Sequence, residues 1–216
     1  MFFRKEYQAR VGKNEMIMSE LLSNAFRSVQ HQIKVPPLCN YSHSSNNKAR
    51  CRLNLYAMNI GILDYLLISN LEANAKMYIT TLQNRLVETI CQADSQVVEN
   101  IEELILDKKL ISNLVDISIN EIKYGILSKK NLLDSYIFNR IKEYNYAIDL
   151  KVKLMSKSDL NAGKTYLTNC PVTKVFTQDF LGTDYKGSSE FSTLFTKNIS
   201  VKSLNLFSKL IDEILS

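Results

Sequence analysis

The chain has 216 residues, a length that allows one domain, or one domain with a small appendage. Hydrophobic residues make up 45% of it, which excludes wholesale disorder, while six glycines and three prolines exclude a collagen-like or linker-like chain. Four cysteines are too few to staple a small disulfide-rich fold. No apolar run approaches the ~18 residues of a membrane-spanning helix. We therefore expect a soluble, ordered and mainly helical protein.

The net charge of +5 is unevenly distributed along the chain. Basic residues predominate over residues 1–60 and 121–216, and acidic residues predominate over residues 61–120. Nucleic-acid binders more often concentrate positive charge on one face without a large acidic block beside it. The layout suits partners with charged patches equally well, including a second copy of the same chain.

The cysteines and histidines predict no metal site. The cysteines are Cys39, Cys51, Cys91 and Cys170, and no two of them form a Cys-x-x-Cys pair. Only His31 and His43 could add imidazole ligands, and neither lies near a glycine-rich turn that would carry a nucleophile. We expect reduced thiols, no metal and no cofactor. Because the N-terminus has no secretory signal, we expect a cytoplasmic protein, unless a specialised export system moves it.

Residues 14–34 are predicted to form an amphipathic helix, because apolar residues recur through them at helical spacing. Asn14 can cap the start of this helix, and Pro36 should end it, since the residue before a proline is pushed out of the α region. The following stretch, 36–49, is rich in proline, serine and asparagine. It is the best candidate for a hinge or a surface loop.

Residues 50–92 show the strongest periodicity in the chain. The unbroken three-four spacing of their apolar residues favours one continuous or kinked helix, while a break at Ser69-Asn70 would give two. The first half is apolar on nearly every side, which is typical of a central buried helix. The second half has polar flanks and is expected to be an outer or partner-facing helix.

Three further helices are predicted in the middle of the chain. Asp94 and Ser95 can cap a helix that runs to about Lys108. Residues 110–127 fit either a helix or a strand, and we favour a helix. Residues 129–146 carry an apolar stripe at helical spacing.

The pattern changes after residue 146. Residues 147–154 alternate apolar and polar side chains, which predicts a half-buried strand. Residues 156–200 are rich in Ser, Thr, Asn and Gly and are expected to form a small β or irregular module. Residues 201–215 form an amphipathic helical pattern. The expected organisation is a helical bundle at 1–146, a β or irregular module at 147–200, and a C-terminal helix at 201–216 that returns to the bundle.

Residues 158–165 end in Gly163-Lys164-Thr165, like a phosphate-binding loop after a strand. However, Ser158 stands where that loop requires its first glycine, which lets the backbone N–H groups turn onto the phosphates. Too little chain follows for the rest of such a fold. We expect a turn with an exposed lysine rather than a nucleotide site.

A second set of residues resembles the pattern of metal-dependent nucleases. Asp149 and Lys151 are two positions apart on the predicted strand, so their side chains would point the same way. Asp134 could complete a magnesium site, with Lys151 steadying the attacking water. Because Asp-x-Lys is common by chance and Asp134 lies in a predicted helix, an exposed charged face is the favoured interpretation.

A third set places positive charge at the start of the most apolar helix. It consists of Lys48, Arg50 and Arg52, with His43 nearby. Positive charges at a helix N-terminus oppose the helix dipole, at a cost of about 0.3–1 kcal/mol each when exposed. A bound anion would offset that cost. The candidates are phosphate groups, an acidic partner, or the chain's own acidic residues Glu99, Glu102, Glu103 and Asp107.

The sequence therefore favours a non-enzymatic helical protein that acts through protein–protein contacts, as a scaffold, an adaptor or a bacterial virulence-associated factor. A protein partner or self-association is expected. The alternatives are a nucleic-acid-binding protein that uses the basic patch at 48–52 and a magnesium-dependent nuclease. Aromatic residues dominate interface energetics, so exposed tyrosines would be candidate anchors. The candidates are Tyr56, Tyr65, Tyr78 and Tyr144.

Overall fold

The computed structural model describes residues 2–40, 45–71, 75–99, 129–155, 170–181 and 189–215. Nearly all of these residues are helical and none of them is in a strand, which confirms a mainly α protein. No described helix is both long and apolar enough to cross a lipid bilayer. The elements with assigned bounds are α1 (Phe2–Gln32), η1 (Leu38–Asn40), α2 (Ser45–Leu71), α3 (Ala75–Ala93), α7 (Lys129–Met155), α9 (Pro171–Leu181), α10 (Ser189–Phe195), η3 (Thr196–Ser200) and α11 (Val201–Leu215).

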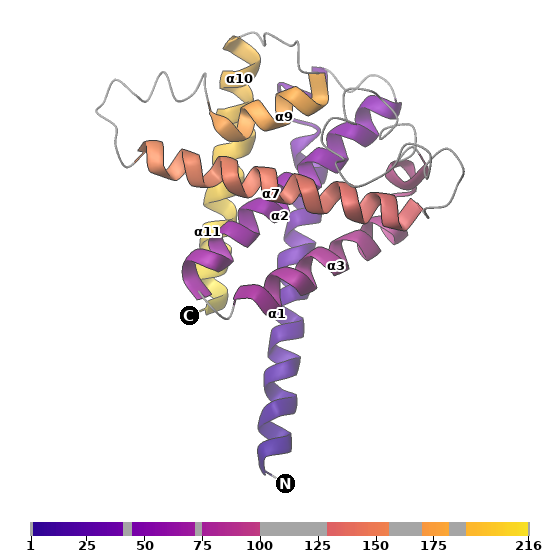
Figure 1. Cartoon of the computed structure of the whole chain (residues 1–216). Coiled ribbons are helices and arrows are strands. Elements are labelled where there is room, and N and C mark those ends of the chain that lie inside the picture. The colour runs from indigo at the N-terminus through magenta and orange to yellow at the C-terminus, as the bar shows by residue number, and fades with distance from the viewer. Residues whose placement is uncertain are drawn as a thin grey trace.

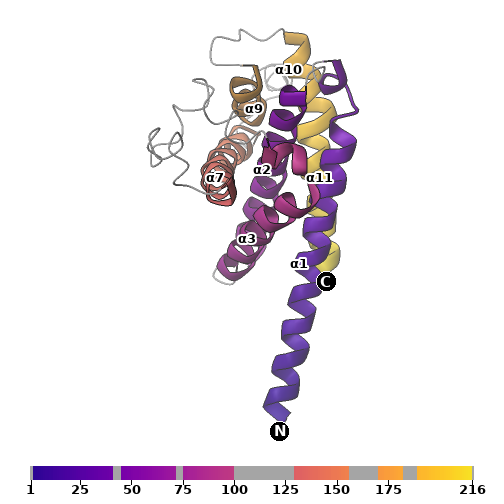
Figure 2. The same ribbon diagram turned by 90° about the vertical axis from the view of Figure 1, so that its right-hand side faces the viewer.

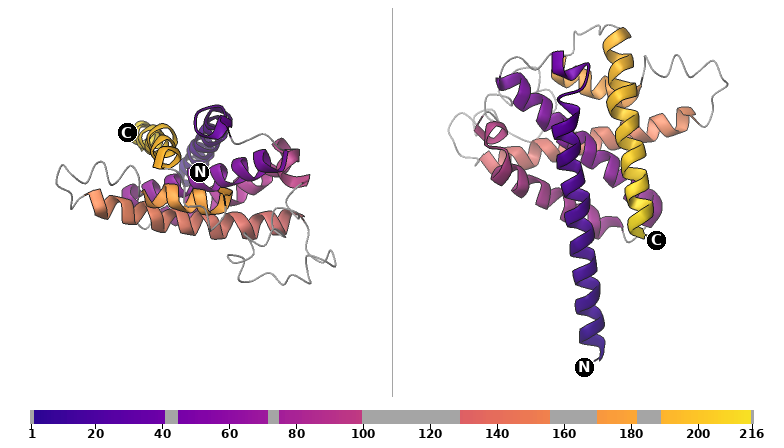
Figure 3. Two further views of the ribbon diagram at one scale, coloured as in Figure 1. Left: turned by 90° about the horizontal axis from the view of Figure 1, so that it is seen from above. Right: turned by 180° about the vertical axis from the view of Figure 1, so that it is seen from behind.

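The helices lie in three layers, as seen from the side in Figure 2. Helices α1 and α11 form one outer layer and lie side by side in opposite directions, which Figure 3 shows from behind. Helices α2 and α3 form the middle layer, and α7 with α9 forms the other outer layer. This order places α2 between α1 and α7. Helix α2 contacts every other long helix of the described chain (Figure 1).

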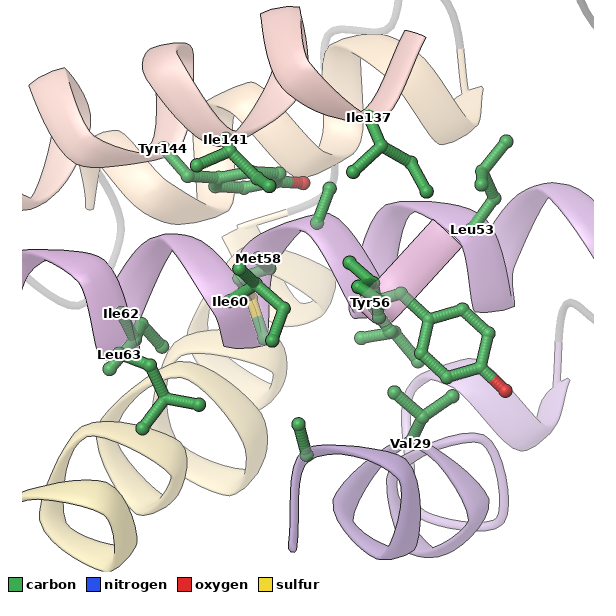
Figure 4. Close-up of a cluster of buried hydrophobic side chains, with 14 of the residues drawn as sticks. Val29, Leu53, Tyr56, Met58, Ile60, Ile62, Leu63, Ile137, Ile141 and Tyr144 are labelled. Atoms are coloured by element: carbon green, nitrogen blue, oxygen red, sulfur yellow. The ribbon is translucent and has the colours of Figure 1, made fainter. Parts of the chain in front are cut away.

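Helix α2 is the centre of the core. Every residue from Leu53 to Asp64 is buried, as expected for a segment that is apolar on nearly every side. Ile141 and Tyr144 of α7 point onto it (Figure 4). Gly61 allows this close approach, because a Cβ at that position would lie 2.8 Å from the Cβ of Tyr144. The packing of α2 on α7 therefore depends on a residue without a side chain.

Helix α1 is longer than predicted at its start. It begins at Phe2, and its first turns extend beyond the other helices (Figure 1). Asn14, predicted as the cap, lies inside the helix, where its Oδ1 accepts a hydrogen bond from the Tyr78 hydroxyl at 2.7 Å. The helix ends at Gln32, close to the predicted end before Pro36. The predicted loop at 36–49 is shortened, since α2 has already begun at residue 45.

The favoured prediction of one helix over residues 50–92 is wrong, and the alternative of two helices is correct. Near the end of α2, Ser69 Oγ and Asn70 Nδ2 donate hydrogen bonds to main-chain carbonyls one turn earlier, at 2.9 and 2.7 Å. Such side chains compete with the main chain for helical hydrogen bonds. Helix α3 then packs back on α2 and buries Leu82 and Leu86, which a single rod would have left without that partner.

The prediction of a strand at 147–154 is also wrong, because these residues form the last turns of α7. Helical spacing continues from the first half of α7 into this segment, through the buried residues Ile137, Ile141, Tyr144 and Ile148. Of residues 156–200, where the β or irregular module was predicted, 171–181 and 189–200 are helical and Cys170 precedes the first of these helices. The other residues of that stretch lie outside the described chain.

Asp94 separates α3 from the next helical residues, 95–99. Its Oδ1 accepts a hydrogen bond from the main-chain N–H of Val97 at 3.4 Å, as expected for the predicted cap. The rest of that predicted helix, to residue 108, and the ambiguous segment 110–127 lie outside the described residues.

Elements α10, η3 and α11 form one continuous rod (Figure 3). Along this rod every fourth residue is buried, namely Phe191, Phe195, Ile199, Ser203, Phe207 and Ile211. In an α-helix each fourth residue advances by about 40° around the axis, so such a stripe would wind away from a straight partner. The π-helical turn η3 contains an extra residue. This residue rotates the following helix back about its own axis, so the stripe stays on one side of the rod. The stripe thereby contacts α9 at one end and α2 at the other, which confirms the predicted packing of the C-terminal helix on the bundle.

Candidate functional site

Two of the basic residues singled out in the sequence line a pocket beside the end of α1. Lys48 and Arg52 are one turn apart in the first turns of α2, and both line a cavity of about 380 Å³. Lys34, just after α1, contributes a third cation, and Ile33 and Cys39 complete the lining. We call this cavity the basic pocket. No carboxylate and no aromatic side chain is among these lining residues.

The position of Arg52 is fixed by partners from beyond the end of α3. Its Nη2 lies 3.1 Å from Asp94 Oδ1 and donates a hydrogen bond to Gln96 Oε1 at 2.6 Å. Asp94 is 5% exposed, and its other oxygen accepts a hydrogen bond from the Tyr56 hydroxyl at 3.1 Å. Burial and the adjacent Asp94 raise the pKa of Tyr56, so this hydroxyl stays protonated and remains a donor. Arg52 is thus preorganised, with its charge balanced by Asp94.

The positive character of the basic pocket comes from its two lysines. Lys34 and Lys48 are both exposed, and neither forms an ion pair with the described residues. Lys34 was not among the predicted residues, because it follows α1, in a different segment of the chain from Lys48 and Arg52. The packing of α1 on α2 brings them to one cavity, and no local pattern in the sequence indicates that packing.

The other two residues of the predicted patch are not part of the basic pocket. Arg50 is half-buried and does not line the pocket. Burial raises the pKa of the Tyr136 hydroxyl on α7, and the positive charges of Arg140 and Arg50 act in the opposite direction, so Arg50 lies close to α7. His43 lies outside the described residues. Of the four predicted residues, the structure therefore brings together Lys48 and Arg52.

The residues of the nuclease-like pattern are not brought together. Asp134 and Asp149 both lie on α7, where fifteen residues at 1.5 Å each separate them by about 22 Å along the axis. Lys151 lies on the same helix, and two positions on a helix differ by about 200° in direction, in contrast to the expected strand. Among the described residues, no group of three or more Cys, His, Asp and Glu side chains is placed to hold a metal ion.

The phosphate-loop-like segment 158–165 lies outside the described residues. So do three members of the acidic cluster, Glu102, Glu103 and Asp107, while the fourth, Glu99, is exposed at the end of a described range.

The candidate tyrosine anchors are mostly buried. Tyr56 and Tyr144 are in the core, and Tyr65 and Tyr78 are partly buried against it. Among the side chains that the structure describes, the exposed aromatic ones belong to α7, where Phe138 is 44% and Tyr146 is 67% exposed. Lys142 lies between them in sequence, with its Nζ 4.1 Å from the centre of the Phe138 ring. This face of α7 was not predicted, because its aromatic residues lie outside the apolar stripe that identified the helix.

A buried carboxyl group lies away from both surfaces. Asp64 of α2 is fully buried and accepts a hydrogen bond from Gln83 Nε2 at 2.7 Å. Burial raises the pKa of this carboxyl from 3.8 to about 7, while the Gln83 and Asn145 side chains act in the opposite direction. Perturbed carboxyl groups occur at catalytic sites, but Asp64 lines neither of the surface cavities described for this chain. Its role in the described structure is therefore to link α2, α3 and α7.

Comparisons with protein-family models, with curated proteins and with solved structures found no match for this chain. Inference about its function therefore depends on the geometry of these residues.

Proposed function

We propose that this chain is a non-enzymatic helical scaffold or adaptor, and that it holds an acidic segment of a partner protein in the basic pocket. The observation that carries the proposal is the convergence of Lys34, Lys48 and Arg52, from two separate segments, on one cavity. The balanced pair of Arg52 and Asp94 gives one wall a fixed shape, and the two lysines supply the unbalanced charge. A partner's carboxylates fit this arrangement.

A nucleic acid is the less favoured ligand. Single-stranded nucleic acids bind to positively charged grooves that also offer aromatic side chains for base stacking. None of the described residues that line the basic pocket is aromatic, and Arg50 is not among them. An acidic protein segment needs neither feature.

Cys39 provides a direct test, because it lines the basic pocket and is half-buried. Cys51 and Cys170 are buried, so a Cys91→Ser background leaves Cys39 as the accessible thiol of the described chain. A glutamate oligopeptide at low salt is expected to slow alkylation of Cys39, and a glutamine oligopeptide of the same length is not. Lys48→Glu should weaken the protection about tenfold, since it replaces attraction with repulsion.

Lys76→Glu is the matched control, because Lys76 is an exposed lysine of α3 that does not line the pocket. In this variant, the protection of Cys39 by the glutamate peptide should stay within about twofold of that in the parent protein. If the glutamate peptide gives no protection at low salt, the proposal is wrong. If only a DNA or RNA oligonucleotide protects Cys39, with an effect that falls steeply with salt, the nucleic-acid alternative replaces it.

A further inference from the structure

A second cavity lies on the opposite outer surface from α7, between α1 and α11. The two helices lie side by side in opposite directions, and both pack mainly on α2 rather than on each other (Figure 3). A groove of about 380 Å³ remains between them, which we call the α1–α11 groove. One wall is formed by residues of α1 between Asn24 and Gln32, and the other by residues of η3 and α11 between Asn198 and Leu206.

The floor of the α1–α11 groove is held by a buried hydrogen-bond network. Gln32 Nε2 donates to Ser203 Oγ at 2.6 Å and to Asn59 Oδ1 at 3.2 Å. Asn59 Nδ2 donates back to Gln32 Oε1 at 3.2 Å and to the carbonyl of Ala25 at 3.4 Å. These bonds join α1, α2 and α11, so the two walls have a fixed spacing before any ligand arrives. A preorganised groove loses less entropy on binding.

The charged side chains among the described lining residues are both basic. Arg27 lies on α1 and Lys202 on α11, and none of the described lining residues is a carboxylate. His31, one turn from Arg27, adds an imidazole that can donate a hydrogen bond. All three side chains are exposed, and none of them forms an ion pair with the described residues. On the α11 wall, Leu206 lies one turn after Lys202, is 46% exposed and offers an apolar contact. The groove therefore complements a segment that carries both carboxylates and an apolar side chain.

The shape of the groove favours a helical ligand. The lining residues of each wall span about two helical turns, from 24 to 32 and from 198 to 206, so the groove is elongated along the helix axes. An amphipathic helix that lies in such a groove presents side chains at three- and four-residue spacing. The wall on α11 begins in the π-helical turn η3, and such turns frequently occur at functional sites.

We propose that the α1–α11 groove binds an acidic helical segment of a partner protein. One carboxylate pairs with Arg27, a second one turn away accepts a hydrogen bond from His31, a third pairs with Lys202, and an apolar residue contacts Leu206. This site is separate from the basic pocket, and it does not depend on a ligand there.

The probe is a short labelled helical peptide of alanine, leucine and glutamate whose glutamates are four residues apart. Fluorescence anisotropy with the full chain at low salt should show binding, and the same peptide with glutamine in place of glutamate should not bind. Lys202→Glu is expected to weaken the affinity about tenfold. Lys197→Glu is the matched control, since Lys197 is an exposed lysine of the same rod that does not line the groove, and its effect should stay within about twofold.

His31 reports on the groove directly, because its imidazole resonance is expected to shift on binding and to stay unchanged with the glutamine peptide. Equal weakening by Lys202→Glu and Lys197→Glu would show general charge attraction and overturn the inference. So would an unchanged affinity in Lys202→Glu together with loss of binding in Lys48→Glu, a result that would leave the basic pocket as the site and the proposed function intact. Absence of peptide binding to the unmodified chain also overturns the inference, while protection of Cys39 still tests the basic pocket separately.

Discussion

Replacing Asp64 by asparagine tests the electrostatics of the core. The carboxyl is fully buried on α2, it receives one hydrogen bond from Gln83, and its Oδ1 has no hydrogen-bond partner. The side chain of Asn145 on α7 lies beside it, and the Oδ1 of Asn145 is also buried without a partner. An amide at position 64 keeps an acceptor for Gln83 and adds a donor for Asn145, at nearly the same volume.

The pH dependence follows from the direction of the shift. The pKa of Asp64 is about 7 in the folded chain, against an ordinary value of 3.8. Below about pH 4 the carboxyl is protonated in both states and has no differential effect. As the pH rises from 4 to 7, the unfolded chain loses this proton first, so the free energy of unfolding falls. The difference between these two pKa values corresponds to about 4 kcal/mol. Above pH 7 the free energy of unfolding is lower by this full amount.

We therefore expect Asp64→Asn to be more stable than the parent chain by about 2–4 kcal/mol at pH 8, and within about 1 kcal/mol of it at pH 4. Urea unfolding followed by far-ultraviolet circular dichroism at several pH values measures this difference. The control is Asp212→Asn, because Asp212 is an exposed carboxylate of α11. If the difference in the free energy of unfolding between Asp64→Asn and the parent chain does not change from pH 4 to pH 8, the reasoning is refuted.

Two further substitutions test the packing. Gly61→Ala should destabilise the chain by about 1–3 kcal/mol in urea unfolding although alanine is the better helix former, because its Cβ would lie 2.8 Å from the Cβ of Tyr144; a neutral or stabilising effect would show that α2 and α7 can separate freely. Phe207→Ala should cost about 3–5 kcal/mol, since its ring is fully buried, while Leu206→Ala, at the half-exposed neighbour, should cost less than about 1 kcal/mol. Equal effects of the two would contradict the assignment of the buried stripe.

Much of the helical architecture could be predicted from apolar spacing, and the errors have identifiable physical causes. The alternation over residues 147–154 predicted a strand, but no turn residue separates this segment from the helical pattern of residues 129–146. The stripe that contains Ile141 and Tyr144 reaches Ile148 at helical spacing. A continuing helical stripe was therefore the stronger signal. A possible break at Ser69-Asn70, near the observed end of α2 at Leu71, could be identified in the sequence, yet local spacing could not reveal that α3 packs back on α2.

The candidate site was predictable only as far as it is local. Lys48 and Arg52 are one turn apart on a helix, so a common direction followed from the sequence. The ion pair of Arg52 with Asp94 joins positions far apart in the chain, and Asp94 was assigned only a capping role. Lys34 and the α1–α11 groove likewise arise from tertiary packing, for which the sequence gives no short-range pattern.

The π-helical turn also bears on how the length of the chain can change. Thr196–Ser200 contains one residue more than an ordinary helix would use over the same rise. Deleting one residue there would yield a regular helix and leave Phe195 and Phe207 on their present sides of the rod. The same deletion a few positions later would rotate everything beyond it by about 100° and turn Ile211 toward water. This turn is therefore a point at which single-residue length variation is compatible with the bundle.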